Sequence, residues 1–488
     1  MPPFSLAPPL KPCYTIPVNI NKLEVLTMER PNAWKQYDEA SLNELNAISE
    51  KYRVFLDGGK TERECVTETV AAAKAAGYID LNDAIKAGKA LKPGDKVYVN
   101  CMGKAVMLFH LGEAPLTEGV NIVGAHIDSP RIDFKQNPFY EDTDLAYADT
   151  HYYGGIKKYQ WVARPMALHG VVAKKDGTLV NVVIGEDADD PVVGISDILI
   201  HLAGEQMGKK ASEAVTGEAL DVLLCGQPLA GEEKEPVKAM LLSILKEKYD
   251  LEEEDMLSAE IEVVPADKCR DFGLDRSMLL GYGHDDRVCS FASLEAILRL
   301  PAVPKHTCCC LLADKEEIGS VGATGMRAHY FENAMAELLA LTSEQYSDLM
   351  LRRALAACRM LSCDVSAGYD PLYASCFEKK NAAYLGRGVC YNKYTGSRGK
   401  SGSNDANAEF LGRLRKIMDD NHVAWQTAEL GKVDVGGGGT IAYICALYGM
   451  EVVDSGVPVL SMHAPLEIIS KADLYEAVKA YHAFMQEA

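Results

Sequence analysis

The sequence predicts an α/β protein whose main domain is interrupted by an inserted domain. Apolar runs of strand length alternate with helical patterns from about residue 259 to the end of the chain. Two helical patterns and three strand-like runs fill residues 41–125. The region 135–258 does not show this alternation of strands and helices. Residues that suit a single site lie on both sides of it. We therefore expect 135–258 to be an insertion.

Composition and charge exclude several classes of function. A chain of 488 residues, 48% of them apolar, can bury a sizeable core and suggests roughly two or three domains. The 70 acidic and 50 basic residues give a net charge of −20, which repels phosphate backbones and anionic membranes. No apolar run approaches the roughly 18 residues of a membrane-spanning helix. Nucleic acids and membranes are therefore not expected partners.

The amino-terminal stretch and the cysteines predict a cytoplasmic protein. The stretch MPPFSLAPPLKPC is Pro-rich with its first charge at Lys11, which is not typical of a signal peptide. The 14 cysteines include no C-x-x-C pair. Cys308, Cys309 and Cys310 lie in an apolar run, where a strand would alternate them between its two faces. This pattern indicates buried thiols in a reducing compartment, with neither a disulfide framework nor a zinc finger.

The first elements have clear start and stop signals. Ser41 and Glu44 predict a capping box for a helix that ends at Gly58, and Thr61 and Glu64 predict a second one before an Ala-rich helix that stops at Gly77. The runs KVYVNC, AVMLFHL and NIVGA then indicate strands. Inside the insertion, GVVAKKDGTLVNVVIG predicts a hairpin that turns at Asp176-Gly177.

Histidines and carboxylates follow four apolar runs. These are NIVGA, followed by His126 and Asp128; CCCLLA, followed by Asp314, Glu316 and Glu317; MLSC, followed by Asp364; and VPVLSM, followed by His463. In an open α/β sheet, ligands bind at the carboxyl ends of parallel strands. If the four runs are parallel neighbours, their polar side chains converge on one edge of the sheet.

This set of side chains suits a metal site. Two histidines and several carboxylates favour zinc, manganese or cobalt, and one carboxylate can bridge two ions. The pair Asp285-Asp286, in the Gly-rich turn GYGHDDR, is the candidate bridge. Glu316 and Glu317 are neighbours at a strand end and point in different directions, so one can bind metal while the other takes a proton from the attacking water.

Other interpretations remain open from the residues alone. A single histidine at a strand end is more often structural, and an acidic pair more often lies in a solvated turn, although their joint occurrence favours a metal site. The glycines Gly436–Gly439 before Thr440 suit either an anion cradle or a tight turn. Neither H-E-x-x-H nor G-x-S-x-G occurs, and Gly399-Lys400-Ser401 lacks the first glycine of a phosphate-binding loop.

Six motifs together resemble the M18 family of metalloaminopeptidases, the aspartyl aminopeptidase family, in its bacterial form. They are GKTERECV, GAHIDSPR, HDDRVCSF, ADKEEIGSVGATG, SCDVSAGYDP and SMHAPLE. The resemblance implies a proteolytic domain, residues 1–134 and 259–488, built on a mixed sheet with helices on both faces. It also implies an inserted, mostly β dimerisation domain, residues 135–258, and a homo-oligomer, a dodecamer built from dimers.

The resemblance also implies roles for individual residues. Asp285 would bridge two divalent ions, most simply zinc, with cobalt or manganese as alternatives. The remaining metal ligands would be His126 and Asp364 on one ion and Glu317 and His463 on the other. Glu316 would be the general base, and Asp128 would orient the imidazole of His126. Related enzymes have a cis peptide where Asp286 follows the bridging acid.

Two further roles concern the neighbouring subunit and the substrate. The run Asp197-Ile-Leu-Ile-His201 resembles a family segment whose histidine stabilises the oxyanion in the neighbouring subunit; the alternative is a histidine packed within the insertion. Lys393 matches a family lysine that would attract an acidic first residue, and Arg398 is the second candidate. The loop TGSRGKSGSNDA departs from the aspartyl-specific pattern, so a broader preference stays open.

The sequence therefore predicts a cytoplasmic dinuclear metalloaminopeptidase that removes N-terminal residues from peptides. Two other functions remain open. One is a dinuclear amidohydrolase acting on N-acyl amino acids, which would share the ligand set. The other is a catalytically silent assembly or peptide-binding protein, against which the presence of Glu316 and the full ligand set argues.

Overall fold

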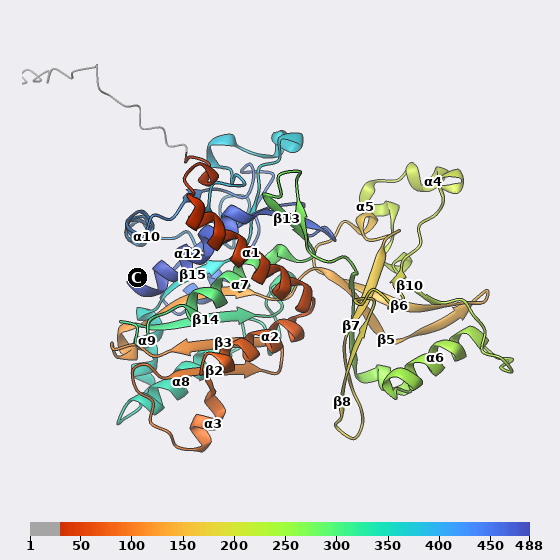
Figure 1. Cartoon of the computed structure of the whole chain (residues 1–488), viewed down its shortest axis with the longest axis horizontal. Coiled ribbons are helices and arrows are strands. Elements are labelled where there is room, and N and C mark those ends of the chain that lie inside the picture. Colours follow the sequence, from red (N-terminus) through yellow and green to blue (C-terminus); the bar gives the residue numbers. More distant parts are fainter. Residues whose placement is uncertain (1–29) are drawn as a thin grey trace, which may run out of the picture.

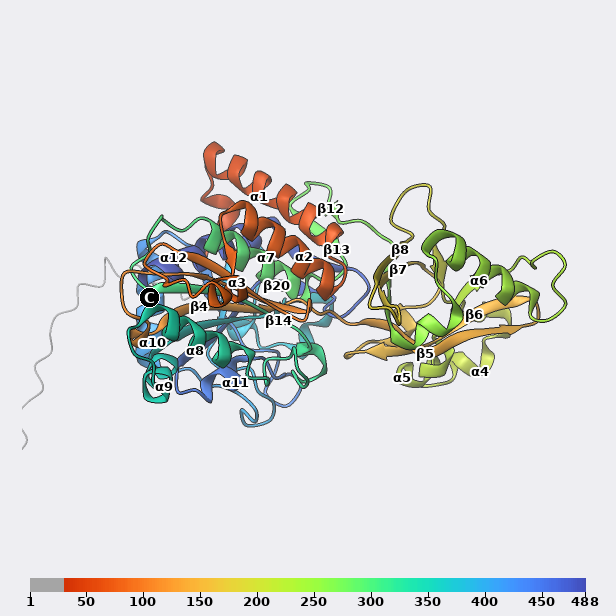
Figure 2. The same ribbon diagram turned by 90° about the horizontal axis from the view of Figure 1, so that it is seen from below.

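A computed structural model describes residues 30–488 and shows two bodies (Figures 1 and 2). The larger body is an α/β domain, and the smaller, β-rich body projects from one side of it. The expectation for the Pro-rich stretch MPPFSLAPPLKPC lies outside the described residues. Within 30–488 no helix is long and apolar enough to cross a membrane, and every cysteine is a free thiol.

A nine-stranded mixed sheet forms the centre of the main domain. Its strand order is β1 (Ile79–Asp80), β2 (Lys96–Cys101), β3 (Ala105–His110), β14 (Thr307–Ala313), β4 (Val120–His126), β15 (Arg359–Cys363), β19 (Glu451–Gly456), β17 (Val389–Asn392) and β18 (Trp425–Thr427). Strands β14, β4, β15 and β19 run parallel, whereas β3 and β17 pair antiparallel with this group. The parallel group brings three of the expected site strands side by side.

Helices cover both faces of this sheet, which confirms the α/β fold class. One face packs against α1 (Glu39–Gly58), α2 (Glu62–Ala75), α7 (His284–Leu298), α10 (Ala408–Asp420) and α12 (Lys471–Glu487). The other packs against α3 (Leu81–Lys86), α8 (Tyr330–Thr342), α9 (Asp348–Ala357) and α11 (Ala442–Ala446). In β14, Cys308 and Cys310 point into the first core and Cys309 into the second, as the strand period predicts.

One of the two expected capping boxes is confirmed, and the other is wrong. Thr61 and Glu64 form the reciprocal pair at the start of α2. Helix α1 instead begins at Glu39, and its N-cap is Asp38, whose carboxylate accepts hydrogen bonds from the backbone N–H and the hydroxyl of Ser41, both at 2.8 Å. The Asp38 carboxylate is an equally good cap and comes first along the chain, so Ser41 lies inside the helix.

A five-stranded sheet corrects the expectation of four parallel neighbours. Its order is β12 (Arg270–Phe272), β13 (Met278–Gly281), β21 (Glu467–Ser470), β20 (Pro458–Leu460) and β16 (Ser366–Ala367). The run VPVLSM forms β20 here, so it does not lie in the main sheet beside β4, β14 and β15. The preceding run EVVDSG forms β19 and takes that place beside β15; it ends at Gly456, where a Cβ would lie 1.7 Å from the carbonyl oxygen of Asp364.

The inserted domain is a closed antiparallel sheet of seven strands. They are β11 (Ala259–Pro265), β5 (Arg131–Asp142), β6 (Leu145–Tyr153), β10 (Val222–Cys225), β9 (Val193–Gly194), β7 (Pro165–Ala173) and β8 (Leu179–Ile184). Strand β11 pairs with both β5 and β7, which closes the sheet, and β7 and β8 form the expected hairpin. Strand β5 starts before the expected boundary at 135, and β11 runs past the one at 258.

Three helices accompany this sheet: α4 (Gly204–Met207), α5 (Ala211–Ala214) and α6 (Pro236–Tyr249). Helix α6 packs its Val237, Leu241 and Leu245 into the core of the inserted domain. The inserted domain thus has a hydrophobic core of its own, separate from the two cores of the main domain.

Candidate metal centre

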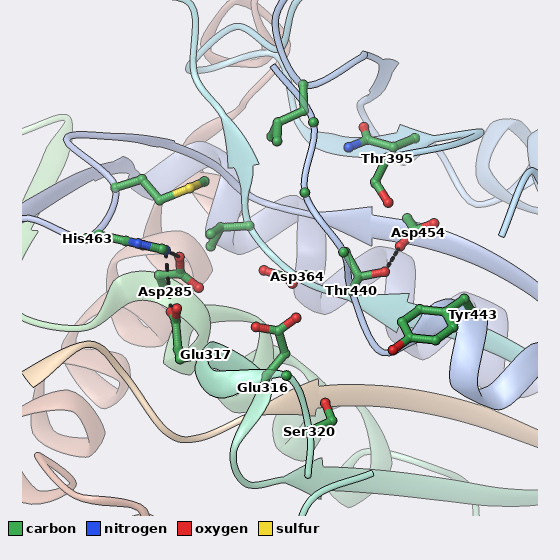
Figure 3. Close-up of a pocket in the computed structure, with 18 residues that line it drawn as sticks. Asp285, Glu316, Glu317, Ser320, Asp364, Thr395, Thr440, Tyr443, Asp454 and His463 are labelled. Carbon is green, nitrogen blue, oxygen red and sulfur yellow. Dashed lines mark hydrogen bonds and ion pairs between the residues drawn. The ribbon is translucent and has the colours of Figure 1, made fainter. Parts of the chain in front are cut away.

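A cavity of about 440 Å³ opens at the carboxyl ends of the parallel strands of the main sheet (Figure 3). His126 is the last residue of β4, and Asp364 directly follows β15. Glu316 and Glu317 lie in a single 3₁₀ turn after β14. The expected convergence of these three strand ends is therefore present in the structure. All but His126, which is buried behind them, line the cavity.

Two further residues reach the cavity from outside the parallel strands. Asp285 lies at the start of α7, where its backbone departs from helical geometry. His463 lies in the loop between β20 and β21 of the five-stranded sheet. The sequence reasoning named both residues, but it placed His463 at the end of a strand in the main sheet.

The carboxylate of Asp285 lies between the two histidines. Its Oδ1 is 3.3 Å from Nε2 of His126, and its Oδ2 is 3.2 Å from Nε2 of His463. One carboxylate therefore offers one oxygen to each imidazole, which is the arrangement needed to bridge two cations.

A second carboxylate accompanies each histidine. Oδ1 of Asp364 is 3.8 Å from Nε2 of His126, and Oε1 of Glu317 is 3.4 Å from Nε2 of His463. The donors thus fall into two groups that share Asp285. Nitrogen and oxygen donors of this kind suit zinc, and the buried Oδ1 of Asp285 accepts no hydrogen bond from the described residues, so the set fits a bound cation.

The second acid of the pair is also close. The peptide bond between Asp285 and Asp286 is cis. Oδ2 of Asp286 accepts a hydrogen bond from the backbone N–H of His126 at 3.3 Å. Donor atoms of His126, Asp286 and Asp364 lie within 4.8 Å of one another, so Asp286 is the alternative carboxylate at this position.

The electrostatics of the cluster favour positive charge. Burial opposes ionisation of Asp285, but the imidazoles of His126 and His463 hold its pKa below the ordinary value. Burial likewise opposes the charged form of His463, yet Asp285 and Glu317 raise its pKa to about 10. The carboxylates therefore hold protons on the imidazoles, and a divalent cation would displace these protons when it binds.

Glu316 has the environment of a proton acceptor. Its carboxylate lines the cavity opposite Asp364 (Figure 3). Burial and the charge of Asp364 raise the pKa of Glu316 to about 8. A raised pKa makes a carboxylate a better base near neutral pH, provided that nearby cations keep it ionised.

Asp128 connects His126 to the turn that carries Glu316 and Glu317. Its Oδ1 lies 3.3 Å from Nδ1 of His126, which is also 3.0 Å from the Asp128 backbone carbonyl. Its Oδ1 and Oδ2 accept hydrogen bonds from the backbone N–H groups of Glu316 and Glu317, at 3.1 and 3.2 Å. This buried residue therefore lies where it can orient the imidazole, through its carbonyl as well as its carboxylate, and it also holds the turn.

Glu467 holds backbone N–H groups in the other half of the cluster, and the sequence analysis did not identify this residue. Its Oε2 accepts a hydrogen bond from the backbone N–H of Asp285 at 2.9 Å, and its Oε1 accepts one from that of His463 at 2.6 Å. The residue is buried at the start of β21. Its place at the end of SMHAPLE was the only signal in the sequence.

Three residues with expected roles are not among those that line the cavity of this chain. His201 lies in a short 3₁₀ turn of the inserted domain, and its side chain is exposed. Lys393 directly follows β17 and is exposed, as is Arg398. Among the described residues that line the cavity there is no lysine or arginine.

The glycine-rich segment before α11 forms another wall of the cavity, through Gly437, Gly438, Gly439 and Thr440. Gly437 has a φ of +122°, and a side chain there would lie 2.6 Å from the Cα of Ser397. A tight turn with close backbone approach therefore accounts for this glycine. The hydroxyl of Thr440 donates a hydrogen bond to Oδ1 of Asp454 at 2.5 Å (Figure 3).

The chain is similar to known proteins over most of its length. Residues 55–485 match the family described as "Aminopeptidase I zinc metalloprotease (M18)". A "Probable M18 family aminopeptidase 1" of Clostridium acetobutylicum is 57% identical over 461 residues, which cover 94% of this chain and 99% of that protein.

Solved structures show the same similarity. An M18 family aminopeptidase from Thermotoga maritima has a TM-score of 0.90 and 44% identity, covering 94% of this chain and 100% of that one. Aminopeptidase I from Clostridium acetobutylicum has a TM-score of 0.87 and 55% identity, covering 94% and 99%. These matches confirm the family resemblance drawn from the motifs.

Proposed function

Because the chain belongs to the M18 family of zinc metalloproteases and is therefore an aminopeptidase, we propose that it works with two metal ions held side by side. His126 and Asp364 would hold one ion, and Glu317 and His463 the other. Asp285 would serve both. The observation that carries this proposal is the position of Asp285, which offers one carboxylate oxygen to each histidine.

Glu316 is the proposed general base. The ions, when bound, would supply Lewis acidity toward the scissile carbonyl and the attacking water. Glu316 lines the cavity beside the proposed ligands and would accept the proton of that water. The same carboxyl group would then return the proton to the leaving amine. Asp128 and Glu467 would keep the ligands in place through the backbone N–H groups that they accept.

The cavity supports a substrate with a free amino group. Carboxylates dominate its charged lining, and they attract the positive α-amino group of a peptide. A preference for acidic first residues stays a prediction that depends on Lys393 or Arg398. Since both are exposed and neither lines the cavity of one chain, the cavity itself supports a broader preference.

A substrate panel tests the function. The zinc-loaded protein should hydrolyse aminoacyl substrates with a free amine and should leave their N-acylated counterparts intact. Faster cleavage of N-acyl amino acids would instead indicate an amidohydrolase. A loaded protein that binds peptides without turnover would show an assembly or binding role. Asp and Glu substrates compared with Leu and Lys substrates would decide the acidic preference.

The inserted domain is the proposed dimerisation surface. Around His201 it exposes large apolar side chains, between 47 and 71% accessible: Ile198, Leu199, Ile200, Leu202 and Met207. Such a patch favours a protein partner. With a second copy as that partner, His201 is the residue proposed to stabilise the oxyanion in the neighbouring active site. Yeast aminopeptidase 1, which shares the fold at 19% identity, is described as a dodecamer. Leu202→Glu should give smaller species by light scattering, and an unchanged assembly would contradict this surface.

A further inference from the structure

We propose that residues 153–155, at the end of β6 in the inserted domain, position the metal centre of their own chain. This inference rests on the ligand set of the proposed function. It gives the inserted domain a role within one subunit, in addition to any contact between subunits. Three neighbouring residues carry it, and each touches a different part of the cluster.

Tyr153 fixes the carboxylate of Asp128. Its hydroxyl donates a hydrogen bond to Oδ2 of Asp128 at 2.8 Å. The same oxygen accepts the backbone N–H of Glu317, while the other oxygen faces Nδ1 of His126. Because Asp128 is fully buried, the hydroxyl restricts a group that touches both halves of the cluster.

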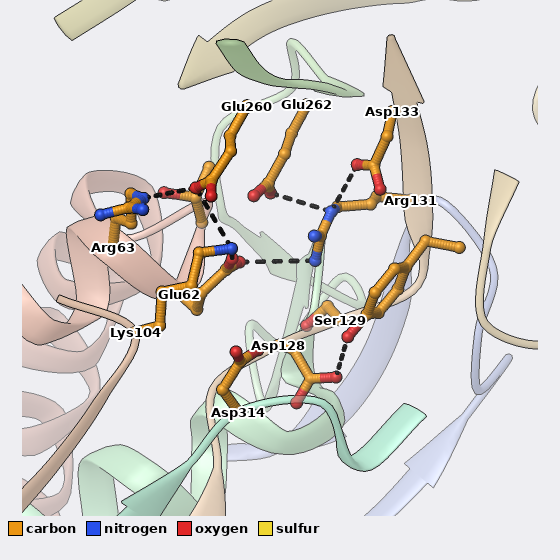
Figure 4. Close-up of polar contacts among 12 residues, drawn as sticks. Glu62, Arg63, Lys104, Asp128, Ser129, Arg131, Asp133, Glu260, Glu262 and Asp314 are labelled. Carbon is orange, nitrogen blue, oxygen red and sulfur yellow. Dashed lines mark hydrogen bonds and ion pairs between the residues drawn. The ribbon is translucent and has the colours of Figure 1, made fainter. Parts of the chain in front are cut away.

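The ring of Tyr153 is itself held in place. The guanidinium of Arg131 lies 3.9 Å from the ring centroid. Arg131 is buried and forms ion pairs with Asp133 at 2.7 Å, Glu262 at 3.2 Å and Glu62 at 3.4 Å (Figure 4). Glu62 belongs to α2 of the main domain, whereas Asp133 and Glu262 belong to β5 and β11. The network therefore fixes Tyr153 at the junction of the two domains.

Gly155 orients the second histidine. Its backbone carbonyl is 2.8 Å from Nδ1 of His463. A carbonyl can only accept, so Nδ1 must carry the hydrogen. In the neutral imidazole this leaves the lone pair on Nε2, the nitrogen that faces Asp285 and Glu317. The inserted domain thus selects the tautomer that can bind a metal.

Gly154 brings the segment against a third predicted ligand. Its φ is +75°, and a Cβ built there would lie 3.5 Å from both Cβ and Oε2 of Glu317. The backbone of Gly154 therefore lies beside the side chain of Glu317. Together with the contacts of Tyr153 and Gly155, this places one wall of the metal centre in the inserted domain.

Tyr153→Phe tests the inference, because it keeps the ring on Arg131 and removes only the hydroxyl. Zinc affinity, measured by competition with a chromophoric chelator, should fall roughly 10- to 100-fold, as when other groups that orient metal ligands are removed. Tyr152→Phe is the matched control, because Tyr152 lies on the same strand and is 39% exposed. The zinc affinity of this variant should equal that of the wild type. Equal affinities for Tyr153→Phe and Tyr152→Phe would overturn the inference.

Hydrogen exchange gives a readout that does not depend on activity. Zinc should slow amide exchange over residues 150–156 in the wild-type protein and should slow it much less in Tyr153→Phe. Exchange at the hairpin turn 174–178 should not respond to zinc in either protein. If the wild type binds zinc while 150–156 stays unaffected, the inference is wrong and the proposed function stands. If the wild type binds no zinc, both are wrong.

Discussion

The main domain and the inserted domain contribute to the metal centre by different means. The main domain supplies every proposed ligand, chiefly from the ends of parallel strands and from the start of α7. The inserted domain supplies no proposed ligand, but Tyr153 contacts Asp128, which lies against His126, and the carbonyl of Gly155 contacts His463 directly. The proposed metal-binding side chains therefore come from the main domain alone, whereas the orientation of these side chains depends on both domains. Substitutions in the two domains should therefore have effects on metal binding and activity that differ in kind and in size.

Asp285→Ala should have the largest effect, because one carboxylate faces both imidazoles. Elemental analysis should show the loss of about two ions per chain together, whereas His126→Ala or His463→Ala should weaken mainly one. Activity should be lost with the metals. If the Asp285 variant still holds two ions, Asp286 is the bridging acid, and Asp286→Ala is the variant to compare.

Glu316→Gln should retain both ions and lose activity by roughly 10²- to 10⁴-fold, the usual range for a general base. The measurement pairs kcat with metal content on the same sample. Glu337→Gln, on the exposed face of α8, is the control and should leave both quantities unchanged. Near-normal turnover by a metal-loaded Glu316→Gln protein would remove this residue from the mechanism.

A pair of glycines in the inserted domain separates backbone strain from contact with the centre. Gly154 and Gly177 have φ values of +75° and +88°, so alanine at either position should cost about 1–2 kcal/mol of stability. Only Gly154 has Glu317 nearby; a side chain at Gly177 would meet open space. Gly154→Ala adds a methyl group in van der Waals contact with Glu317, so it should weaken zinc binding by less than Tyr153→Phe does, while Gly177→Ala should leave zinc binding unchanged. Equal zinc affinities would show that the contact with Glu317 has no effect.

The smallest effect on zinc binding should come from a contact at the domain junction that lies away from the proposed metal ligands. Nδ1 of His169, on β7, is 2.7 Å from Glu64, and Nε2 is 3.0 Å from Glu186, which also pairs with Lys60 and Lys268. Burial opposes its charged form, but Glu186 and Glu64 raise the pKa of His169 above its ordinary value. This stabilisation is fully present below the unfolded pKa of about 6.5 and is lost as pH rises through the folded pKa.

His169→Gln should therefore lower the free energy of unfolding by roughly 1–3 kcal/mol at pH 6 and by less at pH 9, measured with urea. Zinc affinity should stay at the wild-type value, in contrast to Tyr153→Phe. A loss of unfolding free energy that grows with pH would contradict the inference that His169 is positively charged in the folded protein. A loss of zinc affinity would show that any disturbance of the junction reaches the metals.

Part of the site was predictable because strand ends leave a local pattern. His126, Glu317 and Asp364 each follow an apolar run, and parallel strands bring such ends together at one edge of a sheet. The position of His463 was not predictable in this way. Its run VPVLSM has the apolar pattern of a main-sheet strand, but the pattern does not say which sheet a strand joins.

The sequence by itself determined the fold class and predicted the insertion and the residue types of the candidate metal centre, because strand period, turn residues and paired acids are local signals. Only the tertiary structure revealed Glu467, Tyr153 and Gly155. Their roles depend on backbone N–H and carbonyl groups and on one hydroxyl, which every chain contains in abundance and which carry no distinctive pattern. Gly155 and His463 are far apart along the chain and meet only after both domains have folded, so no local signal can report their contact.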